Sequence, residues 1–159
     1  MGQFNSKITA EYNPPRKWIL QKALSYSCTD LTPEDKANLN YVGVELTGDN
    51  GDTITVKKDF VTDLASVPRM AWAFIAPWDV ARAAIIHDLL YKRIRQYRHK
   101  FGSDQSSQLV SDSKKVADKV FLKGMEDADP KVPTWKIKAA YWAVRLFGRW
   151  SIIPNKDNI

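Results

Sequence analysis

Short apolar segments separated by turn-forming residues run through the first part of the chain, a pattern typical of β-strands. Residues 1–62 are therefore predicted to be β-rich. Extended segments are expected at residues 8–12 and 17–27, although residues 20–24 would also suit a helix.

A β-hairpin is the clearest local signal in this part. Residues 41–46 and 53–56 are rich in β-branched and apolar side chains and flank the turn-forming residues 48–52. An Asn-Gly pair in that turn favours the positive φ angles of a tight hairpin. Upstream, Thr32 is a candidate helix N-cap, with Pro33 at the first helical position.

After residue 62 the apolar spacing changes to the three-and-four pattern of amphipathic helices. Three helices are predicted, at residues 79–98, 105–127 and 133–148. The Asp-Pro pair at 129–130 is expected to end the second helix, and Gly148 to cap the third. One face of the first helix is expected to carry the residues that recur at this spacing: Val80, Ala84, His87, Tyr91 and Ile94.

These elements predict one α+β domain over residues 1–159. A small N-terminal antiparallel β-sheet (1–62) is followed by a three-helix part (63–150) and a tail (151–159). The length suits a single domain, and the 44% hydrophobic content is enough for one core.

Charge and aromatic content add information about partners. The net charge of +6 favours anionic partners. The densest basic run, residues 92–100, fits either a solvated helix end or a recruiting surface. Five of the six tryptophans lie at residue 72 or beyond, where they suit core packing or an interface with one apolar and one wet side.

Several classes of protein are not expected. Cys28 is the single cysteine, which excludes an intramolecular disulfide and zinc sites built on cysteine pairs. The sequence has neither a transmembrane-length apolar stretch nor a signal-peptide pattern. Nucleic-acid binding is not expected, because the basic residues follow no known module. An HD-type phosphohydrolase needs a further upstream histidine, and the other histidine, His99, lies downstream.

The main candidate for chemistry is the apolar segment at residues 83–91. His87 and Asp88 are adjacent within it, and buried polar groups are costly unless they are satisfied. Tyr91 lies one helical turn from His87 and can donate a hydrogen bond nearby. A lone histidine would be explained most simply as a satisfied core residue, but the three together favour a site.

A second carboxylate is expected to orient the imidazole. Consecutive helical residues point about 100° apart, so His87 and Asp88 serve different partners. Asp118, at the edge of the apolar stripe of the next helix, is the candidate, with Asp112 as the alternative.

The segment between the two halves carries Asp63, Ser66 and Arg69 just after a predicted strand. Loops held by rigid elements are where binding residues concentrate. The alternative is that Ser66 caps the next helix, Pro68 begins it, and Asp63 makes an Asx turn.

Taken in order, three blocks resemble a phage and prophage family known as domain of unknown function 1353, over about residues 55–150. The blocks are Thr-Asp-x-Ala-Ser-x-Pro-Arg at 62–69, Ala-x-x-x-His-Asp-x-Leu-Tyr at 83–91 and Ala-Asp-x-x-Phe at 117–121. This resemblance implies a phage origin, and with it a place in the host cytoplasm or the virion.

The same blocks are similar to those of prokaryotic secreted phospholipases A2. The matching residues are Thr62, Asp63, Ser66 and Pro68 in the first block, His87, Asp88 and Tyr91 in the second, and Asp118 and Phe121 in the third. The resemblance implies a phospholipase A2-like helix pair. It also implies that His87 is a general base activating water, with its imidazole held by Asp118 and steadied by Tyr91.

The resemblance further implies a calcium ion. Asp63 and Asp88 would be ligands, and backbone carbonyls near Leu64 would complete the oxygen shell. The ion would polarise the ester carbonyl and stabilise the oxyanion.

The sequence also departs from these enzymes. Leu64 and Ala65 replace their Gly-Cys, their disulfides are missing, and the interval from His87 to Asp118 is longer. The expected function is calcium-dependent hydrolysis of a membrane-lipid ester, with an anionic phospholipid membrane as partner. The alternative is a non-enzymatic phage virion, tail or assembly protein that contacts other phage structural proteins and keeps the centre for its fold.

Overall fold

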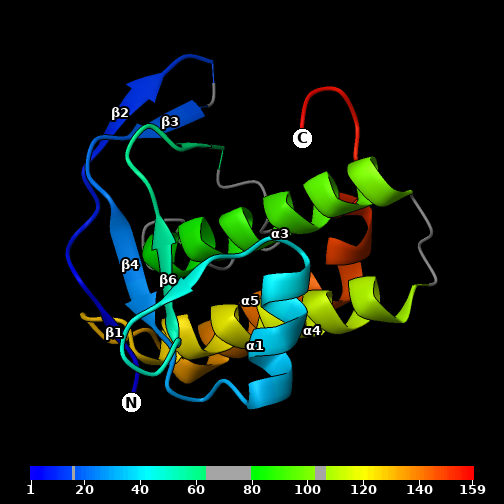
Figure 1. Ribbon diagram of the computed structural model, residues 1–159. Coiled ribbons are helices and arrows are strands. Elements are labelled where there is room, and N and C mark those ends of the chain that lie inside the picture. The colour runs from blue at the N-terminus through cyan, green and yellow to red at the C-terminus, as the bar shows by residue number, and fades with distance from the viewer. Residues whose placement is uncertain (16, 64–79, 103–106) are drawn as a thin grey trace.

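The computed structural model describes residues 1–15, 17–63, 80–102 and 107–159, and its N-terminal strands form two small antiparallel sheets (Figure 1). The first has the order β1-β4-β6-β5 and consists of β1 (Gln3–Phe4), β4 (Leu24–Ser27), β6 (Thr53–Val56) and β5 (Leu46–Thr47). The second has the order β2-β3-β7 and consists of β2 (Ala10–Asn13), β3 (Lys17–Leu20) and β7 (Val61–Thr62).

The expected single sheet is divided because the segment 17–27 bends after Leu20. β3 pairs with β2 and β7, whereas β4 pairs with β1 and β6. Leu20 and Leu24 on either side of the bend are both buried, while Gln21 and Lys22 between them are polar. The strand is therefore broken there so that both leucines enter the core, and no helix forms at 20–24.

The predicted hairpin is confirmed, with a shorter first strand. Leu46 lies opposite Ile54, and both turn glycines, Gly48 and Gly51, have positive φ angles of 85° and 60°. Residues 41–45 do not form a strand: Tyr41 is the last residue of α1 (Pro33–Tyr41), and Gly43, with a positive φ angle of 89°, lies in the turn that follows.

Helix α1 begins as the sequence predicts. The Thr32 side chain accepts a hydrogen bond from the Asp35 backbone N–H, and the Asp35 carboxylate accepts one from the Thr32 N–H. The Asp35 carboxylate also accepts a hydrogen bond from Lys119 Nζ at 2.6 Å, which ties α1 to the second long helix. Burial alone would raise the pKa of Asp35, but these hydrogen bonds and the Lys119 charge lower it.

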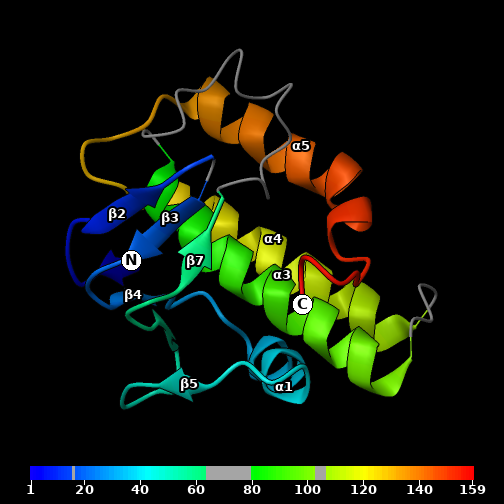
Figure 2. The ribbon, with the colours of Figure 1, turned by 90° about the horizontal axis from the view of Figure 1, so that it is seen from above.

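Three long helices follow the sheets: α3 (Ala81–Phe101), α4 (Gln108–Glu126) and α5 (Thr134–Ser151). Figures 1 and 2 show α3 and α4 side by side in antiparallel directions, with α5 packed along α4 on the outer side. The α+β class and the three helices are confirmed. Gly148 is not a cap, because α5 continues past it and ends at the C-cap Ile152. Within the described ranges, none of the helices has the length and hydropathy needed to cross a bilayer.

The basic run at the end of α3 has a role that the sequence analysis did not anticipate. Arg95 and Arg98 are buried. Arg95 donates to the carbonyls of Ser151 (3.1 Å) and Asn158 (2.7 Å), and Arg98 donates to that of Ile152 (2.7 Å). Two of its cations therefore hold the C-terminal segment against α3 instead of facing solvent.

The capping box yields a stability prediction. Thr32→Ala removes the side-chain acceptor at the start of α1 and is expected to lower the free energy of unfolding by about 1 kcal/mol. Urea denaturation followed by circular dichroism measures the change. Asn40→Ala, an exposed substitution in the same helix, is the control and is expected to be neutral or slightly stabilising. Equal stability of Thr32→Ala and wild type would contradict the capping role.

Candidate active site

His87 lies in the middle of the helical part. It is carried by α3, whose residues from Ala81 to Tyr91 are almost all buried between the first sheet and α4. The imidazole is itself fully buried and packs on the rings of Tyr91 and Phe121, with centroid distances of 4.0 and 4.9 Å. A polar ring in such surroundings is stable only if its nitrogen atoms are satisfied.

Asp118 of α4 provides that partner. Its Oδ1 lies 2.9 Å from His87 Nε2 and accepts a hydrogen bond from the Tyr91 hydroxyl at 2.7 Å. The structure thus brings together the three residues that sequence analysis assigned to one centre. Asp112, the alternative, instead contacts Gln108 and Lys115 near the surface.

Two cations that sequence analysis missed contact the other oxygen of Asp118. Lys114 Nζ lies 2.7 Å and an Arg145 guanidinium nitrogen 2.9 Å from Oδ2. Lys114 could have been found from its i, i+4 spacing to Asp118 on one helix face. Arg145 comes from α5, and no local pattern connects it with Asp118.

These donors keep Asp118 ionised. Burial alone would raise its pKa, but the hydrogen bond and charge of His87, followed by those of Lys114, lower it well below the ordinary value. Burial and the charge of Asp118 raise the pKa of Tyr91 well above its usual value, so the phenol remains a donor.

The ionised carboxylate fixes the tautomer of His87. A carboxylate only accepts hydrogen bonds, so the proton between the two groups must lie on Nε2. In the neutral ring, Nδ1 then carries the lone pair. Among the residues that the structure describes, Nδ1 has no hydrogen-bond partner. A neutral imidazole oriented in this way has a basic nitrogen available to take a proton.

Helix α5 closes over this centre. Lys114 Nζ donates to the backbone carbonyl of Val144 at 3.1 Å as well as to Asp118. Gly148 lies against the Tyr91 hydroxyl, and a β-carbon at this position would overlap that oxygen. The glycine that the sequence suggested as a cap is therefore needed for close packing.

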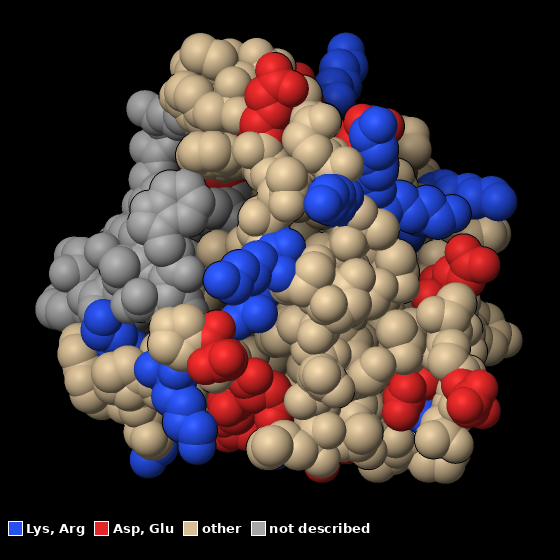
Figure 3. All heavy atoms as spheres, turned by 90° about the vertical axis from the view of Figure 1, so that its left-hand side faces the viewer, with Lys and Arg blue, Asp and Glu red and all other residues tan. Residues whose placement is uncertain are grey.

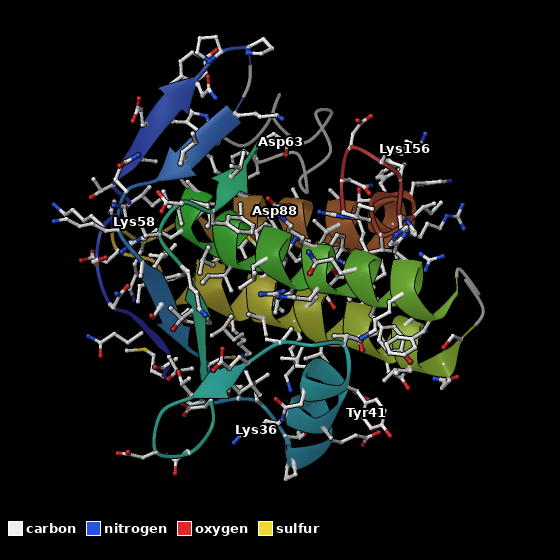
Figure 4. All side chains as sticks on the ribbon, turned by 45° about the horizontal axis from the view of Figure 1, so that its top comes forward. Lys36, Tyr41, Lys58, Asp63, Asp88 and Lys156 are labelled. Carbon is white, nitrogen blue, oxygen red and sulfur yellow. The ribbon has the colours of Figure 1, made fainter. Side chains whose placement is uncertain are left out.

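The two predicted metal ligands line a common cavity of about 290 Å³. Figure 4 shows Asp63, which follows β7, and Asp88, on α3, near one another. Arg95 lies in the same wall, with a guanidinium nitrogen 3.9 Å from Asp88 Oδ1. Burial lowers the pKa of Arg95, and the charges of Asp88 and Asp63 oppose that shift.

The remaining predicted positions, Leu64, Ser66 and Arg69, lie outside the described residues. Within the residues that are described, no cluster of three or more His, Cys, Asp and Glu side chains is arranged to hold a metal ion. The described chain thus supplies three acidic side chains to the cavity, Asp63, Asp88 and Asp157, together with the cations of Lys17, Lys92 and Arg95.

The Asp118 network yields a prediction for stability against pH. Because its pKa is lowered on folding, the carboxylate stabilises the protein above its unfolded pKa of about 3.9, and this contribution is lost as the pH falls below that value. Asp118→Asn leaves Lys114 and Arg145 without a buried counter-ion and should cost roughly 3–5 kcal/mol at pH 7. Urea denaturation from pH 7 to pH 2 measures both effects.

Asp112→Asn is the matched control, since Asp112 also pairs with a lysine on α4 but remains partly exposed. Its effect should stay within about 1 kcal/mol. A similar loss in both variants would show that the network around Asp118 has no special importance.

Comparison with known proteins gives one match. No curated protein and no solved structure matches the chain significantly. A family model matches residues 40–144, more than half of the chain, and this range contains His87, Tyr91 and Asp118. The chain therefore belongs to the family described as "Protein of unknown function (DUF1353)".

Proposed function

We propose that this chain is a phage-encoded, phospholipase A2-like hydrolase that cleaves an ester of a membrane lipid. The observation that carries the proposal is the pairing of His87 Nε2 with the ionised Asp118, which leaves Nδ1 as a basic nitrogen. The Tyr91 hydroxyl, bonded to the same oxygen of Asp118, holds the carboxylate in place.

The proposed reaction is general-base hydrolysis. His87 Nδ1 removes a proton from water as the water oxygen attacks the ester carbonyl carbon, giving a tetrahedral oxyanion and an imidazolium. Asp118 stabilises the imidazolium by its negative charge. Collapse of the intermediate breaks the bond to the alkoxy oxygen, which receives the proton from Nδ1. A fatty acid and the alcohol are released.

The cations at Asp118 have a consequence for this mechanism. Lys114 and Arg145 hold the carboxylate ionised, so Asp118 can accept from Nε2 throughout the reaction. Lys114 and Arg145 also screen part of the negative charge of Asp118 from the imidazolium. Asp118 therefore acts on His87 mainly by orienting its ring.

Calcium binding is a separate part of the proposal. Asp63 and Asp88 line one cavity, and carboxylate oxygens are the ligands that Ca²⁺ prefers. Calcium takes about six to eight oxygens, so backbone carbonyls near Leu64 and water would have to complete the shell. The guanidinium of Arg95 would share Asp88 with the ion. When bound, the ion would polarise the ester carbonyl.

The complete burial of His87 adds a requirement. Water and the ester carbonyl must both approach Nδ1, and proton transfer needs contact at hydrogen-bond distance. Catalysis therefore requires a rearrangement around the imidazole when substrate binds.

The central test is release of fatty acid from vesicles of anionic phosphatidylglycerol in buffer containing calcium. His87→Gln is expected to reduce the rate by roughly 10²–10⁴-fold, because it removes the general base. His99→Gln, an exposed substitution on the same helix, should leave the rate unchanged. Circular dichroism establishes that each variant is folded. The proposal would be excluded if His87→Gln still hydrolysed lipid. It would also be excluded if wild type released no fatty acid with any divalent cation tried.

The calcium requirement is tested in the same assay. Asp63→Asn and Asp88→Asn are each expected to raise the calcium concentration needed for half-maximal rate, because each removes a charged ligand. EGTA should abolish release. Full activity in EGTA would show that hydrolysis does not require calcium. The calcium part of the proposal would then be wrong, and the general-base part would remain.

The second candidate is a non-enzymatic phage virion, tail or assembly protein. It is favoured by the burial of His87 and by the four donors that satisfy Asp118 within the fold. A buried polar network of this kind can specify a unique core without reacting. Cosedimentation of the protein with phage particles, together with no lipid hydrolysis, would support this function.

A further inference from the structure

The outer face of α5 exposes an unusual number of large apolar side chains. Trp135 and Trp142 are each 58% exposed, Leu146 59% and Trp150 53%. Single exposed apolar residues are ordinary, but a contiguous group of this kind commonly marks an interaction site.

These four residues form one stripe, which we call the α5 stripe. They are separated by seven, four and four positions, a spacing that keeps side chains on one side of a helix. At about 1.5 Å per residue, the stripe runs for roughly 22 Å, nearly the whole helix. Figure 2 shows that α5 packs along α4 with one side and turns its other side away from α3, α4 and both sheets.

Positive charge flanks the stripe. Helix α5 contains four basic residues and no acidic one. Lys136 lies over the ring of Trp135 at 5.8 Å, and the guanidinium of Arg149 lies over the ring of Trp150 at 4.1 Å. Lys138 is exposed on the same helix.

The charge on α5 differs from that on the face shown in Figure 3. That face carries both Lys and Arg and Asp and Glu side chains, whereas α5 has no acidic residue. A helix that combines tryptophans with cations and lacks carboxylates is typical of a segment lying in the headgroup region of a bilayer. Protein interfaces, by contrast, are depleted in lysine.

We propose that the α5 stripe is the surface by which this protein binds an anionic phospholipid bilayer. The helix lies in the plane of the interface, with Trp135, Trp142 and Trp150 at the boundary of headgroups and acyl chains. Lys138 and Arg149 contact lipid phosphates, and the aliphatic parts of their side chains lie along the aromatic rings. The choice of a lipid ligand rests on the proposed function, but binding itself requires no turnover.

The position of α5 connects this surface to the His–Asp centre. The inner side of the same helix supplies Arg145 to Asp118, and its Gly148 packs on the Tyr91 hydroxyl. A bilayer bound at the stripe would therefore contact a helix whose inner side packs on the centre. Movement of α5 at the membrane would change the surroundings of His87 through Asp118 and Tyr91.

The test is cosedimentation with phosphatidylglycerol vesicles and with phosphatidylcholine vesicles, both in EDTA so that calcium is absent. Wild type is expected to bind the anionic vesicles at least tenfold more tightly than the neutral ones, and less tightly as salt rises. The double variant Trp142→Glu, Leu146→Glu should lose at least tenfold in affinity. Tyr41→Glu, which places the same charge at a 73% exposed aromatic position on α1, should bind as wild type does.

Brominated lipid gives a second measurement. It should quench tryptophan fluorescence of wild type and of Tyr41→Glu, but not of the double variant. His87→Gln should bind vesicles normally, so a failure of lipid hydrolysis and a failure of membrane binding can be told apart. Trp142→Lys is a further variant. Its affinity for anionic vesicles should fall less than that of Trp142→Glu.

Three results would overturn the proposal. The first is equal vesicle binding by wild type and the folded double variant. The second is a wild-type dimer, seen by analytical ultracentrifugation, that the double variant dissociates, because the stripe would then bind a second copy. The third is that wild type binds a single-stranded oligonucleotide more tightly than vesicles and that the double variant loses this oligonucleotide binding. Stacking of bases on tryptophan would then explain the exposed surface.

Discussion

The ionised carboxylate of Asp118, buried where three helices meet, is the interaction on which the helical part depends. It accepts hydrogen bonds from His87 and Tyr91 of α3, Lys114 of α4 and Arg145 of α5. A buried carboxylate is tolerated only when its charge is paired and its oxygens are satisfied, and these four donors do both. The position of α5 over the other two helices is thus coupled to one charge.

The same interaction serves both the fold and the proposed chemistry. Donation from Nε2 to Asp118 fixes the tautomer of His87 and leaves Nδ1 basic. It also places the imidazole deep in the core, against Tyr91 and Phe121. Stability and reaction therefore make opposite demands on the surroundings of Nδ1, since packing excludes the water that a general base requires. Helix α5 is involved in both demands, because it contacts the centre on one side and carries an exposed aromatic stripe on the other.

A second charged side chain, Arg95, joins several segments on another side of α3. Arg95 donates to backbone carbonyls of the C-terminal segment and also lies beside Asp88, in the cavity that Asp63 lines. One guanidinium thus joins the C-terminal segment to the candidate cation site. Arginine suits this position because its planar, permanently charged group presents several donors at once.

The sequence by itself determined the α+β class, the three long helices and the β5–β6 hairpin, because apolar periodicity and turn residues act locally. It also pointed to His87, Tyr91 and Asp118, since polar groups in apolar helical stretches need partners. Only the tertiary structure decided that Arg145 reaches Asp118, that Gly148 packs on Tyr91, and that the strand breaks after Leu20. These contacts join residues far apart in the chain or depend on which side chains enter the core, and no local pattern records that.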